Sequence, residues 1–358
     1  MSRDVESVVC WAAIAVMLLA WSFVSVGFGA RFDEPVGADY DLHMRLAQDY
    51  LEGSPAFLDA SVIKENGGPY PPLFHMVLAA GILLGISTFV GLLLQALFIP
   101  LAMLLTALLV RRFVGLRAAV LSLVVLSASL AFIDRTQVTP QGMDMVLLPM
   151  IIWTSLADRW KWTVALTALS IWSHGGYAFC ILLGLVLMCL TGRKTKSCLN
   201  KVVLWTAALS SPIIVLTIWF LPSYLIASAG TNSIQESLML AHPTSFFLYI
   251  SLPIIAAIIA SAARQWFATW TPLERAAWMM VAAFIPILVF FPDRFASYVA
   301  IPAAILAGTL EPAMTSRRPW GRTAFWCLVA AVSAYALFNN YIIWVHLLLG
   351  QGPYIIQT

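Results

Sequence analysis

Residues 37–53 of the chain read GADYDLHMRLAQDYLEG, a short charged segment set between long apolar runs. After Asp39, apolar residues recur near helical spacing with charged residues between them (Leu42, Leu46 and Leu51), and Gly53-Ser-Pro ends the pattern. The pattern predicts an amphipathic helix that lies at a membrane surface, with Asp39 at or near its N-cap and Asp41 in its first turn. Asp is also common at N-caps that have no catalytic role.

The rest of the composition is that of an integral membrane protein. Of 358 residues, 61% are hydrophobic and only 10% are charged, against about 25% charged in an average soluble domain. Apolar runs near the length of a membrane span recur from Val8 to His346. The first, Val8 to Gly29, is too long for the core of a signal peptide and lacks its cleavage pattern. We therefore expect an all-α polytopic protein of about 11 transmembrane helices, each needing roughly 20 apolar residues, with residues 1–358 forming a single membrane domain.

Basic residues in short loops stay in the cytoplasm, so their clusters orient the chain. These clusters are Arg111/Arg112/Arg117, Arg159/Lys161, Arg193/Lys194/Lys196/Lys201, Arg264 with Arg275, and Arg317/Arg318/Arg322. Placing all of them inside predicts a cytoplasmic N-terminus, a plasma-membrane location, and crossings near residues 118–133, 143–157, 162–173, 176–191, 202–221, 246–263, 276–291, 296–311 and 324–346. Residues 70–111 require an odd number of crossings but hold two apolar pieces (72–86 and 89–110). One of these pieces is therefore expected to be re-entrant or to lie at the surface.

This topology gathers the unusual polar residues on the outer face. The loop over residues 31–70 is outside and holds eight of the chain's 17 acidic residues. A second outer loop is expected over residues 222–245. The other polar residues expected on this side are Asp134, Arg135, Asp144, His174, Glu236, His242, Asp293 and Arg294. Because ionisable groups near membrane depth are costly and usually functional, we expect one active-site cleft on the extracytoplasmic face, with 31–70 as its catalytic loop.

Several segments resemble, in order, those of type-C (GT-C fold) glycosyltransferases, a family that includes the membrane core of oligosaccharyltransferase catalytic subunits. Asp39-Tyr-Asp-Leu-His-Met-Arg-Leu-Ala47 resembles the family's Asp-x-x-x-His-x-x-x-Ala stretch in a large outer first loop. Tyr70-Pro-Pro-Leu-Phe-His75 resembles the segment that leads into the next helix. Arg135 to Met145 resembles the second outer loop, with Asp144 as its acid. Later, Ser173-His-Gly-Gly-Tyr177 resembles a helix-pair tip that carries His, and Asp293 to Pro302 a segment whose Arg contacts the donor phosphate.

The chain departs from the oligosaccharyltransferase pattern. It lacks the Trp-Trp-Asp-Tyr-Gly signature that reads a peptide acceptor, and the soluble C-terminal domain that holds this signature. These departures argue against protein N-glycosylation. They favour a compact single-sugar transferase, or one that needs a membrane protein partner subunit.

The resemblance implies transfer of a sugar from a polyprenyl-phosphate-linked donor in the lipid bilayer to a glycan, lipid or protein acceptor, with inversion. Asp39 is the expected base, with Asp41 as the second candidate. Arg294 suits the donor phosphate because a guanidinium binds phosphate oxygens in a bidentate way. His174 and Arg135 are further phosphate candidates, although a helix-tip histidine can simply face water. Candidates for acceptor or lid contacts are Tyr70, His75, Glu236 and His242.

Other interpretations remain open. Asp39, Asp41 and Asp144 could instead hold Mg²⁺ or Mn²⁺ through hard oxygen ligands. The chain could also be a multi-pass transporter or lipid-linked-saccharide flippase, or a non-catalytic scaffold subunit with the GT-C fold. Transporters tend to carry charges near the bilayer midplane and to show two related halves, whereas here the charges lie at helix ends and in loops. No nucleic-acid partner is expected.

Overall fold

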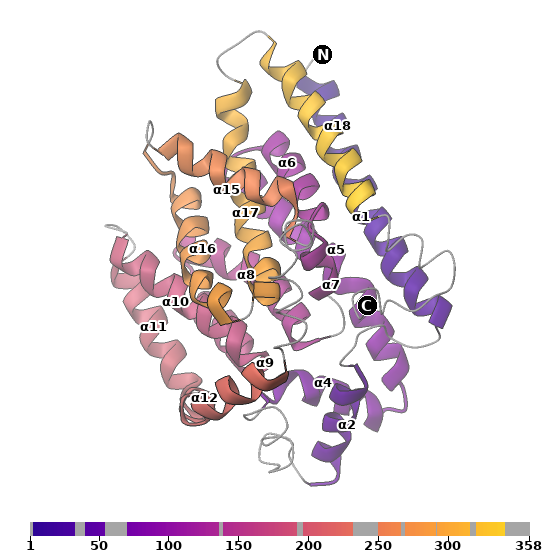
Figure 1. Cartoon of the computed structure of the whole chain (residues 1–358), viewed down its shortest axis with the longest axis vertical. Helices are drawn as coiled ribbons and strands as arrows, with labels where there is room; N and C mark the ends of the chain where they lie inside the picture. Colours follow the sequence, from indigo (N-terminus) through magenta and orange to yellow (C-terminus); the bar gives the residue numbers. More distant parts are fainter. Residues whose placement is uncertain are drawn as a thin grey trace.

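The computed structural model of the protein describes residues 3–32, 40–53, 70–135, 139–191, 196–231, 250–265, 269–290, 292–315 and 320–340. Every regular element within these ranges is a helix, as expected (Figure 1). The helices are α1 (Arg3–Phe32), α2 (Tyr40–Leu51), α4 (Leu73–Leu83), α5 (Ser87–Phe113), α6 (Leu116–Ser127), α7 (Leu130–Arg135), α8 (Pro140–Leu156), α9 (Trp160–Ser173), α10 (Gly175–Thr191), α11 (Lys196–Leu209), α12 (Ser211–Thr231), α15 (Leu252–Gln265), α16 (Pro272–Phe290), α17 (Pro292–Thr315) and α18 (Gly321–Asn339).

Several of these helices are long and apolar enough to cross a bilayer. By length and composition, α1, α5, α17 and α18 qualify singly among the described residues, and the bent pair α11–α12 qualifies as one span. Helix α17 is the centre of the bundle, because 83% of its spanning window is buried against 22% for α1 and for α18. The peripheral helices therefore offer their apolar faces to lipid. The chain is an integral membrane protein.

Helix α17 packs closely against α5 and α6 because Gly308 has no side chain. A Cβ atom on Gly308 would lie 2.7 Å from Cγ1 of Val110 and 2.9 Å from the carbonyl oxygen of Ala118. Both distances are far shorter than an ordinary van der Waals contact. Gly308 thus sets the spacing of the central helices.

The apolar run expected to cross as one span near 118–133 is interrupted. Helix α6 ends at Ser127 and α7 begins at Leu130, so carbonyl groups at the break lose their intrahelical partners. Asn340 and Asn339, at the end of α18, donate from Nδ2 to the carbonyls of Ser127 and Ala128, each at 2.9 Å. These amides therefore supply hydrogen bonds to the carbonyl groups at the break, which would be costly to leave unpaired inside an apolar bundle.

The structure corrects one further expectation. The run 202–221 is not one straight crossing, since α11 and α12 meet at a bend of 76°. Pro212 explains the bend, because a proline ring clashes with the carbonyl four residues earlier and stops the preceding helix. Helix α12 continues through Pro222 to Thr231, so the first part of the segment expected as a second outer loop is helical.

The ambiguity over residues 70–111 is resolved by length and packing. Helix α4 has 11 residues, which is about 16 Å at 1.5 Å per residue, too short to cross. It packs against the amphipathic helix α2, and both lie across one end of the molecule in Figure 1. Helix α5, with 27 residues, has spanning length. We therefore treat α4 as the surface piece and α5 as the crossing.

Partly buried ion pairs join helix ends at the opposite end of the bundle. Arg117 contacts Glu6 at 3.1 Å and Glu311 at 2.6 Å, which ties together the starts of α1 and α6 and the last turns of α17. Arg264 contacts Glu274 at 2.6 Å and the carbonyl oxygen of Thr309 at 2.8 Å. Two of the basic residues used to predict the topology, Arg117 and Arg264, thus both contact the last turns of α17.

Candidate active site

Helix α2 forms as the sequence predicts but turns a different face inward. Asp41 lies in the first turn of the helix and is exposed, as is Arg45. Leu51, which the spacing places on the apolar face, is also exposed, at 38%. The buried residues are Tyr40, His43, Leu46 and Ala47. A histidine therefore lies on the face that α4 covers. One face of α2 therefore packs against α4, and the face that holds Asp41 and Arg45 is exposed.

His43 of α2 meets His75 of α4 in a buried contact. Nδ1 of His43 lies 3.0 Å from Nε2 of His75, and Nδ1 of His75 lies 3.1 Å from the carbonyl oxygen of Pro71. The His43 ring makes edge-to-face contacts with Tyr70 and Phe74. Burial is the main cause that lowers the pKa of each histidine from 6.5 to about 3, so both rings are neutral at physiological pH.

His174 occupies the turn between α9 and α10. Its Nδ1 accepts the backbone N–H of Tyr177 at 3.2 Å and so caps the start of α10. Burial and, to a smaller extent, the nearby positive charge of Arg294 lower the pKa of His174 from 6.5 to about 3. The neutral ring with an occupied Nδ1 carries its hydrogen on Nε2, where it can donate to a ligand.

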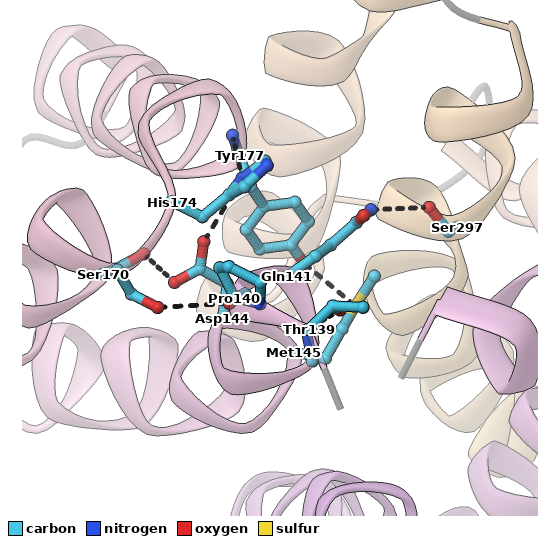
Figure 2. Close-up of polar contacts among 11 residues, drawn as sticks. Thr139, Pro140, Gln141, Asp144, Met145, Ser170, His174, Tyr177 and Ser297 are labelled. Atoms are coloured by element: carbon cyan, nitrogen blue, oxygen red, sulfur yellow. Dashed lines mark hydrogen bonds and ion pairs between the residues drawn. The ribbon is translucent and has the colours of Figure 1, made fainter. Parts of the chain in front are cut away.

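Asp144 lies in α8 below this turn and is completely buried. Its Oδ1 accepts from the hydroxyl of Ser170 on α9 at 2.8 Å (Figure 2). Its Oδ2 is 3.8 Å from Nδ1 of His174, but this is not an ion pair, because the histidine is neutral and its Nδ1 already accepts a hydrogen bond. Within the described residues Oδ2 has no hydrogen-bond donor.

The start of α8 is fixed by a cap and by contacts to two other helices. Thr139 accepts the N–H of Gly142 at 3.1 Å and Pro140 occupies the first turn, a combination that favours helix initiation. Ser173 donates to the carbonyl of Pro140 at 3.2 Å. Gln141 donates to Ser297 of α17 at 3.2 Å, as Figure 2 shows.

Arg294 lies in the first turn of α17, beside these residues. Ser297 donates to the carbonyl oxygen of Arg294 at 2.8 Å. One turn further on, Tyr298 packs edge-to-face on Tyr177 of α10, with ring centroids 4.3 Å apart. These contacts place the starts of α10 and α17 side by side. His174 and Arg294, predicted to face one site, are therefore neighbours at the same end of the bundle.

The α2–α4 contact adjoins the same place. A Cβ atom on Gly175 would lie 3.8 Å from Cγ of Pro71, so the segment before α4 packs against the turn that holds His174. His174, when protonated, also lowers the pKa of His43, which indicates that the two rings are near each other. The structure thus brings His43, His75, Asp144, His174 and Arg294 to one end of the protein.

The structure describes the other predicted site residues only in part. Asp39, Glu236 and His242 lie outside the described residues, and Arg135 is described only as the last residue of α7. Tyr70 is half-buried beside His43 and His75. In the described part of the chain, no three Asp, Glu, His or Cys side chains form a metal-binding group. The buried Oδ2 of Asp144 is a candidate oxygen ligand for Mg²⁺, which proteins usually bind through one or two carboxylates together with water and substrate phosphates.

Some site residues have no role in the sequence-based prediction. His43 lies within the quoted motif, but its burial depends on which helix covers α2. Ser170, Gln141 and Ser297 are ordinary residues in apolar helices, and only their partners make them notable. A clue for Gln141 is that a polar amide in the first turn of an apolar helix needs a hydrogen-bonding partner.

Comparison with solved structures identifies the fold. The chain resembles the crystal structure of ArnT from Cupriavidus metallidurans bound to undecaprenyl phosphate, with 17% identity and a TM-score of 0.58 over 98% of this chain and 77% of that one. The apo structure of the same protein matches with 19% identity and a TM-score of 0.52 over the same shares. ArnT is a type-C glycosyltransferase. The protein therefore has the GT-C fold of an integral membrane protein. No protein-family model matches the sequence, and no curated protein matches it.

Proposed function

We propose that this protein is a membrane glycosyltransferase that transfers a sugar from a polyprenyl-phosphate donor to a hydroxyl acceptor on the extracytoplasmic face, with inversion. One observation carries the proposal. His174 and Arg294, at the starts of α10 and α17, lie close enough for the guanidinium to lower the pKa of the imidazole, in a fold shared with an undecaprenyl-phosphate-bound protein. A cation beside a neutral N–H donor suits a phosphate group.

The chemistry divides between the two sides of the donor's anomeric carbon. The acceptor oxygen attacks this carbon as its proton passes to a carboxylate, for which Asp39 is the first candidate and Asp41 the second. The bond from the carbon to the phosphate oxygen breaks with its electron pair, leaving the polyprenyl phosphate. Arg294 and His174 Nε2–H stabilise the charge that develops on this oxygen.

The residues around Asp144 hold this arrangement in place. Ser170 links the α9 end to α8, and Gln141 links α8 to α17 through Ser297. Preorganised donors cost no reorganisation during reaction. The buried position of Asp144 makes it a structural anchor in this proposal, and no step passes through a metal.

The test is transfer in proteoliposomes that contain undecaprenyl phosphate carrying one of a panel of hexoses or pentoses. Wild type should form a new glycosidic bond. Asp39→Asn should reduce the rate at least about a hundredfold, since general acid–base catalysis contributes about 10²–10⁴. Arg294→Ala should also reduce it at least about a hundredfold, since loss of one group that stabilises developing charge costs about 10²–10³. Arg112→Ala, an exposed arginine at the far end of α5, is the matched control. Lipid translocation without bond formation would replace the proposal with a flippase. Full activity of both Asp39→Asn and Asp41→Asn would exclude the proposed mechanism.

A further inference from the structure

The histidine pair between α2 and α4 has no part in the chemistry above. His43 and His75 are 2% and 0% exposed. They sit among aromatic rings, with Tyr50 stacked on His75 at 6.3 Å and Phe74 edge-on to His43 at 5.4 Å. Burying a polar ring costs free energy unless it is hydrogen-bonded, so the partner of each ring nitrogen determines what the pair can do.

The hydrogen bonds of the pair run in one direction only. The carbonyl oxygen of Pro71 can only accept, so Nδ1 of His75, 3.1 Å away, carries a hydrogen. A neutral His75 then has a bare Nε2, which accepts from Nδ1–H of His43 at 3.0 Å. The remaining nitrogen of His43, Nε2, is consequently a bare acceptor.

The helices that carry the histidine pair adjoin the candidate active site. Pro71 anchors the hydrogen-bonded chain and packs against Gly175, directly after His174. Helix α2, which carries His43, also begins at Tyr40, immediately after the proposed base Asp39. The pair therefore lies beside the turn proposed to bind phosphate, on a helix whose first residue directly follows the proposed base in sequence.

A bare, neutral imidazole nitrogen selects its ligands by chemistry. It accepts from O–H or N–H groups and repels phosphate oxygens, which have no hydrogen to donate. Sugars present several hydroxyl groups, and a site built to hydrogen-bond a hydroxyl discriminates strongly against analogues that lack it.

We propose that His43 accepts a hydrogen bond at Nε2 from a substrate hydroxyl group, and that His75 is a positioning residue that fixes the tautomer of His43. The inference rests on the proposed function, because the hydroxyl belongs to the transferred sugar or to its acceptor. His43 is thus a specificity residue on the sugar side of the site, complementary to Arg294 on the phosphate side.

The experiment compares wild type with His43→Phe, which keeps a ring but removes both nitrogens, and His43→Gln, whose side-chain oxygen can accept near the position of Nε2. Arg45→Ala, on the exposed face of α2, is the matched control. The probes are undecaprenyl phosphate and undecaprenyl phosphate carrying glucose, galactose, mannose or arabinose. Binding is measured in nanodiscs and transfer in proteoliposomes.

His43→Phe should bind undecaprenyl phosphate as wild type does. It should lose about tenfold in affinity for the preferred sugar-bearing lipid if the hydroxyl is on the donor, or raise KM for the acceptor about tenfold if the hydroxyl is there. His43→Gln should recover part of either loss. Wild-type behaviour of His43→Phe in both assays overturns the inference, as does equal loss of undecaprenyl phosphate binding in both His43 variants.

Nitrogen-15 NMR of labelled histidine separates this inference from the proposed function, because it needs no turnover. His43 should show a protonated Nδ1 and a bare Nε2, and the Nε2 resonance should shift with a sugar-bearing lipid but not with undecaprenyl phosphate alone. If wild type transfers no sugar but this shift occurs, the glycosyltransferase proposal fails and the hydroxyl site stands. A protonated Nε2, or no shift with any sugar in the panel when transfer is also unaffected by His43→Phe, overturns the hydroxyl site alone.

Discussion

The side-chain amide of Gln141 on α8 donates a hydrogen bond to the hydroxyl of Ser297 on α17, with 3.2 Å between Nε2 and Oγ. The same hydroxyl donates to the backbone carbonyl of Arg294 at 2.8 Å. One serine thus joins the helix that carries Asp144 to the first turn of the helix that carries Arg294. The position of the guanidinium depends on two helices that are far apart in sequence.

Replacing Ser297 with alanine should reduce both stability and phosphate binding. Gln141 is buried, and the loss of its acceptor leaves a buried amide donor unsatisfied, which costs about 1–3 kcal/mol. Thermal unfolding in detergent and affinity for undecaprenyl phosphate report the two effects. Ser333→Ala is the control, since its hydroxyl bonds only to Val329 of its own helix, and should change stability by less than about 0.5 kcal/mol. Adding Gln141→Leu should restore part of the loss, so a strictly additive double variant would contradict this coupling.

Arg294→Lys should weaken binding of undecaprenyl phosphate by about tenfold and Arg294→Ala by about a hundredfold. Hydrogen bonds to a charged group contribute about 1.5–3 kcal/mol, and each 1.4 kcal/mol is tenfold in affinity. Lysine keeps the charge but not the bidentate geometry. Titration of the lipid into nanodiscs measures the affinities, with Arg112→Ala as control. Equal affinity of the lysine variant and wild type would show that only charge matters.

Part of the fold is predictable from the sequence, because membranes impose simple rules. The basic clusters fix which helix ends share a side, and this alone predicts that His174 and Arg294 lie at the same end. The stop at Gly53 and the spacing after Asp39 predict α2. Pro212 also indicates a bend near Ser210. The sequence-based prediction nevertheless gives one crossing, because the apolar run 202–221 is long enough for a single span.

Other features need the three-dimensional neighbours of each helix. The spacing of Leu42, Leu46 and Leu51 predicts the wrong centre for the buried face of α2, because that spacing cannot show that α4 covers His43. The bond between Gln141 and Ser297 joins residues separated by 156 positions. Periodicity within each helix contains no information about such a pair, because the pairing of the two residues depends on which helices pack together.

Gly308→Ala should destabilise the bundle by about 1–3 kcal/mol, the usual cost of overpacking. The new methyl group would meet a backbone oxygen of α6, Ala118 O, at 2.9 Å, and a carbonyl cannot rotate away as a side chain can. Gly176→Ala is the matched control in α10, because its methyl group would meet only Cε1 of His174 at 3.7 Å. That variant should be neutral or gain up to about 1 kcal/mol from helix propensity. Thermal unfolding compares the two, and similar melting temperatures would show that α17 can shift without loss.

Acid should destabilise the protein through His174, and His174→Gln should remove that part of the effect. The folded-state pKa is about 3 against 6.5 for a free histidine, so between these values the unfolded chain binds a proton that the folded protein excludes. Stability contributed by neutral His174 is therefore fully present above pH 6.5 and declines as pH falls toward 3, by up to about 1.4 kcal/mol per pH unit. Chemical denaturation at pH 7.5 and pH 5 should show wild type losing about 2 kcal/mol more than His174→Gln. Parallel losses in the two proteins would mean that His174 is protonated in the folded state, and that its role as a neutral donor to phosphate is wrong.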